Sequence, residues 1–218
     1  MKESENLIEK GKEFSDKKDE EQAIFCFKQL IEKNPKNFEA WLLKGKSHFK
    51  LEEYEEALAC FERAVKLNPK NIDACLDLGK SYRKTGNPFK ELEQINKAIQ
   101  MDSNDSNDWC RIGHAYTNLD QYENAITCLK KALEINPKNI RVMYSLAIIY
   151  GDYLGDPKWA IHYYEKLVDV DKSRSMIKAY AYLKLHKEYN KIGDTKKANE
   201  YLFKGDGILS KFLTKKLL

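Results

Sequence analysis

Two short segments of the sequence have residues that could bind phosphate. Each reads Gly-Lys-Ser, at 45–47 and at 79–81. A phosphate-binding loop also needs a glycine five residues earlier, where the backbone turns tightly against the phosphates. The sequence has Ala40 and Ala74 at those positions. Both segments therefore lack the loop that nucleotide binding requires.

Cysteines and histidines are the other candidate ligands and nucleophiles. They are Cys26, Cys60, Cys75, Cys110, Cys128, His48, His114, His162 and His186. The cysteine number is odd and no CxxC pair occurs, which argues against a disulfide framework or a zinc knuckle. Cys110 and His114 are four residues apart and share a helix face, but two ligands do not make a structural zinc site. We expect no metal ion, no cofactor and no catalytic centre, and reduced thiols predict a cytoplasmic protein.

The bulk composition narrows the class of partner. The chain has 218 residues, a net charge of +4, 42% hydrophobic residues and 33% charged residues. So small a charge argues against bulk electrostatic binding of nucleic acid. No stretch is long and apolar enough for a membrane span, and the first residues lack the apolar core of a secretory signal.

An internal repeat is the main signal in the sequence. Pro35 and Pro69 lie 34 residues apart, and an Asn-Pro-Lys-Asn motif recurs at 34–37, 68–71 and 136–139. A set of glycines follows the same interval, at Gly11, Gly45, Gly79 and Gly113. A fixed period of this length is typical of repeat architectures, in which stacked units bury one continuous core.

Each repeat has the spacing of two helices. In 38–71, Trp41, Gly45 and His48 share one helix face, and Ala57, Phe61 and Ala64 share another. Short side chains allow two helices to approach closely while aromatic rings fill the space around them. The Asn-Pro step ends the second helix, because proline lacks the N–H and clashes with the preceding turn.

These features resemble the tetratricopeptide repeat, whose first helix carries an aromatic residue, Leu, Gly and Tyr, and whose second carries Ala, Phe, Ala and Pro. Six repeats fit, at about 4–37, 38–71, 72–105, 106–139, 140–174 and 179–212. The resemblance implies an all-α fold, a right-handed superhelical α-solenoid of six helix pairs. It also implies that 1–218 form a single array, with the apolar tail 207–218 as a C-terminal capping helix.

Three departures from the repeat pattern carry structural expectations. Repeat three has Glu91 at a position that favours a small residue, so we expect looser packing there, or a helix rotated until Leu92 faces inward. Repeat five has one extra residue near 155–157, where Asp156 would cap a helix that begins with Pro157. About four surplus residues lie between 171 and 178, and they predict an early, long first helix in repeat six.

The resemblance also implies a peptide-binding groove along the first helices. The residues at its lining positions are Lys12, Leu42, Lys46, Phe49, Lys50, Leu76, Lys80, Arg83, Lys84, His114, Arg141 and Tyr144. Leu42 and Leu76 would form an apolar strip flanked by basic side chains, which suits an acidic peptide. The alternative is that the lysines are simply solvated.

The resemblance also raises one narrower function, the binding of a terminal carboxylate of a chaperone. Chaperone-binding members of the family clamp a terminal carboxylate with a defined set of Lys, Asn and Arg, and only Arg111 fits that set. A clamp of that kind is therefore not expected. The main expectation is a non-catalytic scaffold that binds a protein or peptide partner, and the alternative is a homo-oligomer assembled through the apolar tail.

Overall fold

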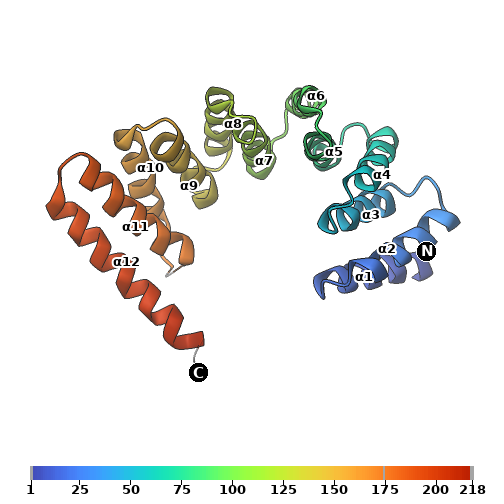
Figure 1. The fold of residues 1–218 in the computed structure, drawn as a ribbon, viewed down its shortest axis with the longest axis horizontal. Coiled ribbons are helices and arrows are strands. Elements are labelled where there is room, and N and C mark those ends of the chain that lie inside the picture. Colours follow the sequence, from blue (N-terminus) through green and yellow to red (C-terminus); the bar gives the residue numbers. More distant parts are fainter. Residues whose placement is uncertain (1, 174, 217–218) are drawn as a thin grey trace. The chain divides into compact units, whose positions relative to one another are not determined.

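The computed structural model describes the backbone of residues 2–173 and 175–216, and side chains from residue 6 to residue 209 except residue 174. In that part of the chain there are twelve α-helices, one short π-helical segment and no strand (Figure 1). The first six helices are α1 (Lys2–Asp16), α2 (Glu20–Lys33), α3 (Phe38–Lys50), α4 (Tyr54–Leu67), α5 (Ile72–Lys84) and α6 (Pro88–Gln100). Then follow α7 (Ser106–Thr117), α8 (Tyr122–Ile135), α9 (Ile140–Ile148), the π-helical segment η1 (Ile149–Tyr153), α10 (Pro157–Val170), α11 (Met176–Lys191) and α12 (Thr195–Lys216). The predicted helix pairs are confirmed.

The Asn-Pro-Lys-Asn motif both ends one helix and starts the next. After α2 the backbone becomes extended at Asn34, whose side chain accepts a hydrogen bond from the N–H of Lys36. Three residues later Asn37 caps α3 by accepting the N–H of Ala40 at 3.0 Å. Asn71 and Asn139 cap α5 and α9 in the same way. Such a cap satisfies an N–H that has no partner inside the helix.

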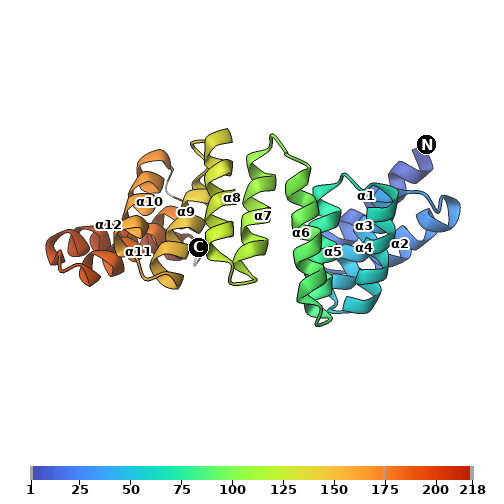
Figure 2. The ribbon, with the colours of Figure 1, turned by 90° about the horizontal axis from the view of Figure 1, so that it is seen from above.

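The chain divides into two compact units, Met1–Ser103 and Asn104–Leu218, called here the N-terminal and C-terminal units. In the N-terminal unit, α3, α4, α5 and α6 lie side by side (Figure 2). The division falls after repeat three, at the one place among the first four repeats where Asn-Pro is replaced by a polar Asp-Ser-Asn-Asp segment at 102–105. The single array of residues 1–218 stays a prediction.

A close contact between a glycine and a large side chain fixes three of the helix pairs. A Cβ atom added to Gly45 would lie 2.7 Å from the ring of Phe61, and one added to Gly11 would lie 2.5 Å from the ring of Phe27. A Cβ atom added to Gly113 would lie 2.8 Å from the side chain of Leu129. Real Cβ atoms do not come so close, so these crossings depend on the missing side chain.

Repeat three has the looser crossing that its sequence predicted. A Cβ atom on Gly79 would meet its neighbours at 3.4 Å or more, which is ordinary van der Waals contact. The helix is not rotated: Glu91 points inward and is 1% exposed, whereas Leu92 is half-buried. The first expectation for this repeat was therefore right and the second was wrong.

The irregular stretches of the C-terminal unit follow from their extra residues. The surplus residue of repeat five is absorbed in η1, and α10 begins at Pro157 with Asp156 as its cap, as predicted. The long first helix of repeat six is also confirmed, because α11 has 16 residues where α3 has 13. The tail does not form a separate helix, since α12 runs unbroken to Lys216. Its side chains beyond residue 209 lie outside the described residues, so its capping contacts stay a prediction.

Candidate functional site

Lysines at one register position line up along the first helices of the N-terminal unit. Lys12 Nζ on α1 lies 2.7 Å from Glu39 Oε1 on α3. Lys46 Nζ on α3 lies 3.6 Å from Asp77 Oδ2 on α5, and Lys80 Nζ lies 3.3 Å from Asp77 Oδ1. Lysines and carboxylates therefore alternate from α1 to α5. We call Lys12, Lys46, Lys50 and Lys80 the basic face.

Lys50 is tied to a buried carboxylate in the preceding repeat. Its ammonium donates to Glu20 Oε1 at 2.8 Å and to Ser15 Oγ at 2.5 Å, and Glu20 is 6% exposed. Burial acts to raise the pKa of Glu20, but hydrogen bonds from Lys50, Ser47 and Ser15 together hold that pKa below its ordinary value. The paired carboxylate stays ionised and keeps Lys50 in place.

A cavity of about 180 Å³ opens between α1 and α3, over the ring of Phe27. Three lysines of the basic face, Lys12, Lys46 and Lys50, reach its wall. Two hydroxyls, Ser15 and Ser47, line it as well. The three ammonium groups and two hydroxyls at its wall are donors that could bind an anionic group.

The other two basic candidates of this unit are engaged within the fold, Arg83 in its own repeat and Lys84 with an aromatic ring of the preceding repeat. Arg83 Nε lies 3.2 Å from the buried Glu91 Oε1. Lys84 Nζ lies 5.2 Å from the centre of the Tyr54 ring, which Phe49 also meets edge-on at 5.2 Å. Arg83 therefore compensates a buried charge, and Phe49 and Lys84 pack on one aromatic residue.

The two predicted apolar lining residues are not open to a ligand. Leu42 is 8% exposed and Leu76 is 2% exposed. Leu42 belongs to a core cluster that includes Phe61 and Leu78. The expected apolar strip is corrected on this point, because these leucines fill the interior between neighbouring helices.

Three predicted residues belong to the C-terminal unit. His114 on α7 lies 2.7 Å from Ser145 Oγ and 3.8 Å from Cys110 Sγ. Arg141 is exposed at the start of α9, and the Tyr144 ring meets Tyr164 at 5.9 Å. The Ser–His–Cys contact looks like a nucleophile with its base, yet burial raises the pKa of Cys110 and Ser145 donates to the Arg141 carbonyl. Neither group is activated as a nucleophile would be.

Sequence reasoning missed a basic cluster on α11. Lys184 and Lys187 both contact the carboxylate of Asp152 in η1, and Lys191 donates to the Gly151 carbonyl at 3.1 Å. Lys187 occupies the same register position as Lys46. The predicted bounds of repeat six, about 179–212, already put Lys187 at this position, so the same register could have identified it.

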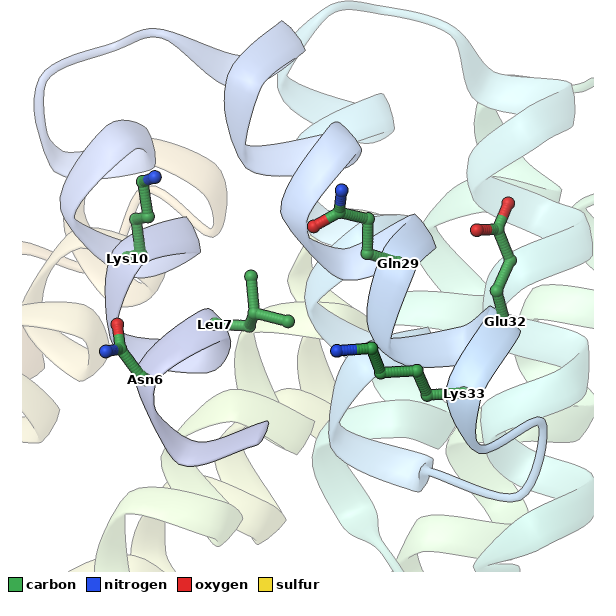
Figure 3. Close-up of a pocket in the computed structure, with 6 residues that line it drawn as sticks. All are labelled: Asn6, Leu7, Lys10, Gln29, Glu32 and Lys33. Atoms are coloured by element: carbon green, nitrogen blue, oxygen red, sulfur yellow. The ribbon is translucent and has the colours of Figure 1, made fainter. Parts of the chain in front are cut away.

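A second cavity, of about 460 Å³, lies between α1 and α2. Figure 3 shows Leu7 of α1 and Lys33 of α2 pointing toward one another, with Glu32 turned away from Leu7. Asn6 and Lys10 complete the α1 side. In later repeats the equivalents of Asn6, such as Ala40 and Ala74, are fully buried. In the first repeat the same register position is polar and lines the cavity.

Neither a metal site nor a membrane span is found in the part of the chain that the structure describes. Among those residues, no three His, Cys, Asp or Glu side chains are grouped so as to hold a metal ion. Within the same residues, no helix combines the length and apolar character needed to cross a bilayer. All five cysteines are buried free thiols.

Comparison with solved structures shows the same fold in several proteins. MamA is 25% identical, with a TM-score of 0.65, over 78% of this chain and 96% of that one. PilW, a type IV pilus biogenesis factor, is 19% identical with a TM-score of 0.76, over 96% and 98% of the two chains. YrrB, a TPR protein with an unusual peptide-binding site, is 20% identical with a TM-score of 0.61, over 88% and 98%. No curated protein matches the sequence.

Family models match at the predicted repeats. One tetratricopeptide repeat model matches residues 38–71 and 107–139, and a second matches 4–37 and 140–174. These four segments agree with the predicted repeats one, two, four and five. Together they cover more than half of the sequence, and the chain belongs to the tetratricopeptide repeat family.

Proposed function

We propose that this chain is a non-catalytic interaction module that holds an acidic segment of a partner protein along the basic face of α1, α3 and α5. The observation that carries this proposal is the line of Lys12, Lys46 and Lys80. Glu39 and Asp77 hold these lysines in place. Helical repeats present one side chain per repeat at a fixed spacing, which suits an extended or helical peptide.

The ion pairs along the basic face position the lysines but do not occupy all the hydrogen-bond donors of each ammonium group. An ammonium group has three donors, and the exposed pairs of this kind contribute little to stability. Lys12 and Lys46 are 50% and 39% exposed in their side chains, so an incoming carboxylate can reach them. Lys12 pairs with an exposed carboxylate, whereas Lys46 and Lys80 share the buried Asp77, so variants at those two lysines are first checked for folding by circular dichroism.

The test is charge reversal on the face. We expect Lys46→Glu with Lys80→Glu to abolish capture of the partner from native extract, and capture by the wild type to weaken steeply with added salt. The matched control is Lys28→Glu with Lys66→Glu, which makes the same change in net charge on α2 and α4. Equal capture by both double variants would refute the proposal.

Self-assembly remains the alternative, and one observation speaks against its simplest form. Five second helices carry an apolar pair at the same two register positions: Ile24 and Ile31, Leu58 and Val65, Leu92 and Ile99, Ile126 and Leu133, Ile161 and Val168. On α12 the corresponding residues are Asn199 and Asp206. Among the side chains described up to residue 209, α12 therefore has no apolar pair at these positions for a second copy to cover. Light scattering on the chain lacking 207–218 tests whether the tail itself drives association.

A further inference from the structure

We propose that the C-terminal unit has a second docking surface, on α8, η1 and α10, which binds a proline-rich segment of a partner in the extended polyproline II conformation. We call this surface the aromatic face, and its residues are Tyr122, Lys130, Tyr150, Tyr153 and Trp159. It lies on helices other than those of the basic face and suits a segment without charge. The inference therefore goes beyond the proposed function.

Large apolar side chains are exposed in the segment 153–159. Trp159 is 45% exposed, Tyr153 is 52% exposed, and Leu154 beside it is 41% exposed. Tryptophan is highly buried on average, and exposed aromatic residues with a polar end are enriched at interfaces. A group of such side chains within one short segment indicates a binding surface rather than single scattered surface residues.

Contacts with α8 join these side chains into one surface. The Tyr153 ring stacks on the ring of Tyr122, the first residue of α8, with the ring centres 4.9 Å apart. The Lys130 ammonium of α8 lies 5.8 Å from the centre of the Trp159 ring. Because Tyr122 and Lys130 are eight residues apart, helix geometry separates the two contacts by about 12 Å along α8. A polyproline II segment rises about 3.1 Å per residue, so about four of its residues span that distance.

The π-helical segment η1 holds the rings in fixed positions. It absorbs the extra residue of repeat five and carries both Tyr150 and Tyr153. The Tyr150 ring stacks on the Trp159 ring at 5.7 Å and 24°. The Tyr122 hydroxyl donates to Asp120 Oδ1 at 2.6 Å, which fixes that ring as well. Rings that are positioned before binding lose little conformational entropy when a ligand packs on them.

The hydrogen-bond donors of the aromatic face select a segment rich in proline. In the part of the chain that the structure describes, the Trp159 indole N–H and the Tyr153 hydroxyl have no hydrogen-bond partner. An indole N–H can only donate. Proline offers a carbonyl acceptor and no N–H, and the polyproline II conformation leaves each carbonyl free of internal hydrogen bonds. Proline rings also pack on aromatic faces, so the surface matches such a segment in shape and in hydrogen bonding.

The charges near the aromatic face disfavour a polyanion. The charged residues within three positions of its four rings are Asp120, Glu123, Asp152, Asp156 and Lys158. With Lys130 they leave no excess positive charge to hold a nucleic acid or an anionic lipid surface. Three of these carboxylates, those of Asp120, Asp152 and Asp156, are already engaged within the fold, so they do not call for a cationic partner.

The experiment is an NMR titration of the full chain with acetyl-hexaproline amide. The readout is the indole N–H signal of Trp159, which Trp159→Phe identifies among the three tryptophans. We expect this signal to shift downfield as the N–H donates to a proline carbonyl. Acetyl-hexaalanine amide, which has N–H groups and no proline rings, should bind much more weakly. No shift with hexaproline, or equal shifts with both peptides, rejects the proposal.

Two variants test the individual contacts, with binding followed at the amide signal of Lys130. Trp159→Phe keeps a ring but removes the donor, and it should weaken hexaproline binding about fivefold, as expected for one hydrogen bond. Tyr153→Ala removes a ring and should weaken binding about tenfold. The matched control is Tyr180→Ala, because Tyr180 is 48% exposed on α11 and outside the aromatic face. Circular dichroism verifies that each variant is folded, and equal weakening by Tyr180→Ala and Tyr153→Ala contradicts the site.

Other occupants of the aromatic face give different results. Binding of phosphatidylcholine–phosphatidylserine vesicles that Trp159→Ala abolishes, without binding of hexaproline, assigns the face to a membrane surface. Self-association in light scattering that Trp159→Ala removes, again without binding of hexaproline, assigns it to a second copy. Either result overturns the proline-rich segment. Lys46→Glu with Lys80→Glu should leave hexaproline binding unchanged, so this inference and the proposed function are tested separately.

Discussion

Repeats two and three are built on the same register but differ at the helix crossing. In repeat two, Gly45 lies against the ring of Phe61, and Ala57 is fully buried. In repeat three the Ala57 position is taken by Glu91, which is also buried. Its Oε1 pairs with Arg83, and its Oε2 has no hydrogen-bond partner in the structure.

The difference shows how one repeat tolerates a charge in its core. Arg83 occupies the register position of Phe49, so the pair adds a cation where repeat two has an aromatic ring. The Glu91 side chain and its backbone keep Gly79 at ordinary van der Waals distance. Gln94 Oε1 is a further buried acceptor without a partner. Repeat two is therefore fixed by shape, and repeat three by an ion pair that leaves unsatisfied polar atoms.

The strongest test moves the charge from one repeat to the other. Ala57→Glu places a carboxylate in repeat two without an arginine, and we expect a loss of about 4 kcal/mol in unfolding free energy. The reciprocal change, Glu91→Ala, should cost less than about 1 kcal/mol, because Arg83 can reach water. Urea denaturation followed by circular dichroism measures both. A similar cost for the two variants would show that the crossings do not differ.

Alanine at the two glycines should have opposite effects. Gly45→Ala forces a methyl group against Phe61, and we expect a loss of about 1–3 kcal/mol from overpacking. Gly79→Ala meets no close contact and gains helix propensity, so it should stabilise by about 0.5–1 kcal/mol. The same denaturation assay compares them, with native-state hydrogen exchange locating the change to α3–α4 or α5–α6. Destabilisation by both variants would contradict the looser crossing.

Removing the arginine should affect repeat three alone. Arg83→Ala leaves Glu91 buried without its cation, and we expect a loss of about 1–2 kcal/mol, reduced from that of a fully buried pair because the arginine is partly exposed. Hydrogen exchange should show faster opening in α5 and α6. Lys84→Ala is the matched control on the neighbouring residue, and an equal effect there would point to helix propensity instead.

The smallest predicted effect is a pH dependence of opposite sign at two buried carboxylates. Burial raises the pKa of Glu91 despite Arg83, so its favourable contribution is present below the ordinary value of 4.5 and is lost as the pH rises through the raised pKa. The pKa of Glu20 is lowered, so its contribution is present above 4.5 and is lost as the pH falls through the lowered pKa.

Glutamine variants isolate the two groups. The stability of the wild type relative to Glu91→Gln should fall as the pH rises above about 4.5. The stability of the wild type relative to Glu20→Gln should rise with pH over the range below about 4.5. Urea unfolding at a series of pH values gives both differences, and carboxylates elsewhere cancel in each comparison. If both stability differences changed with pH in the same direction, the opposite pKa shifts assigned to Glu91 and Glu20 would be contradicted.

The candidate site was only partly accessible to sequence reasoning. The register placed Lys12, Lys46 and Lys80 in one line, because helix pairs of equal length repeat each side chain in the same direction. It could not show that Glu39 and Asp77 lie between them, or that Glu20 reaches Lys50 from another helix. These contacts join residues more than 25 positions apart and depend on how neighbouring repeats pack. The same limit applies to Leu42 and Leu76, whose burial is set by adjacent helices.

By itself the sequence determined the helix pairs, their order and most of their ends. Glycine, alanine and aromatic residues at a fixed interval permit one kind of crossing, and Asn-Pro stops a helix through backbone geometry alone. Only the tertiary structure decided the partners of charged side chains, the π-helical turn at Ile149–Tyr153 and the cavity over Phe27. Helix formation and local packing depend on neighbours in sequence, whereas ion pairs and cavities depend on distances between separate helices.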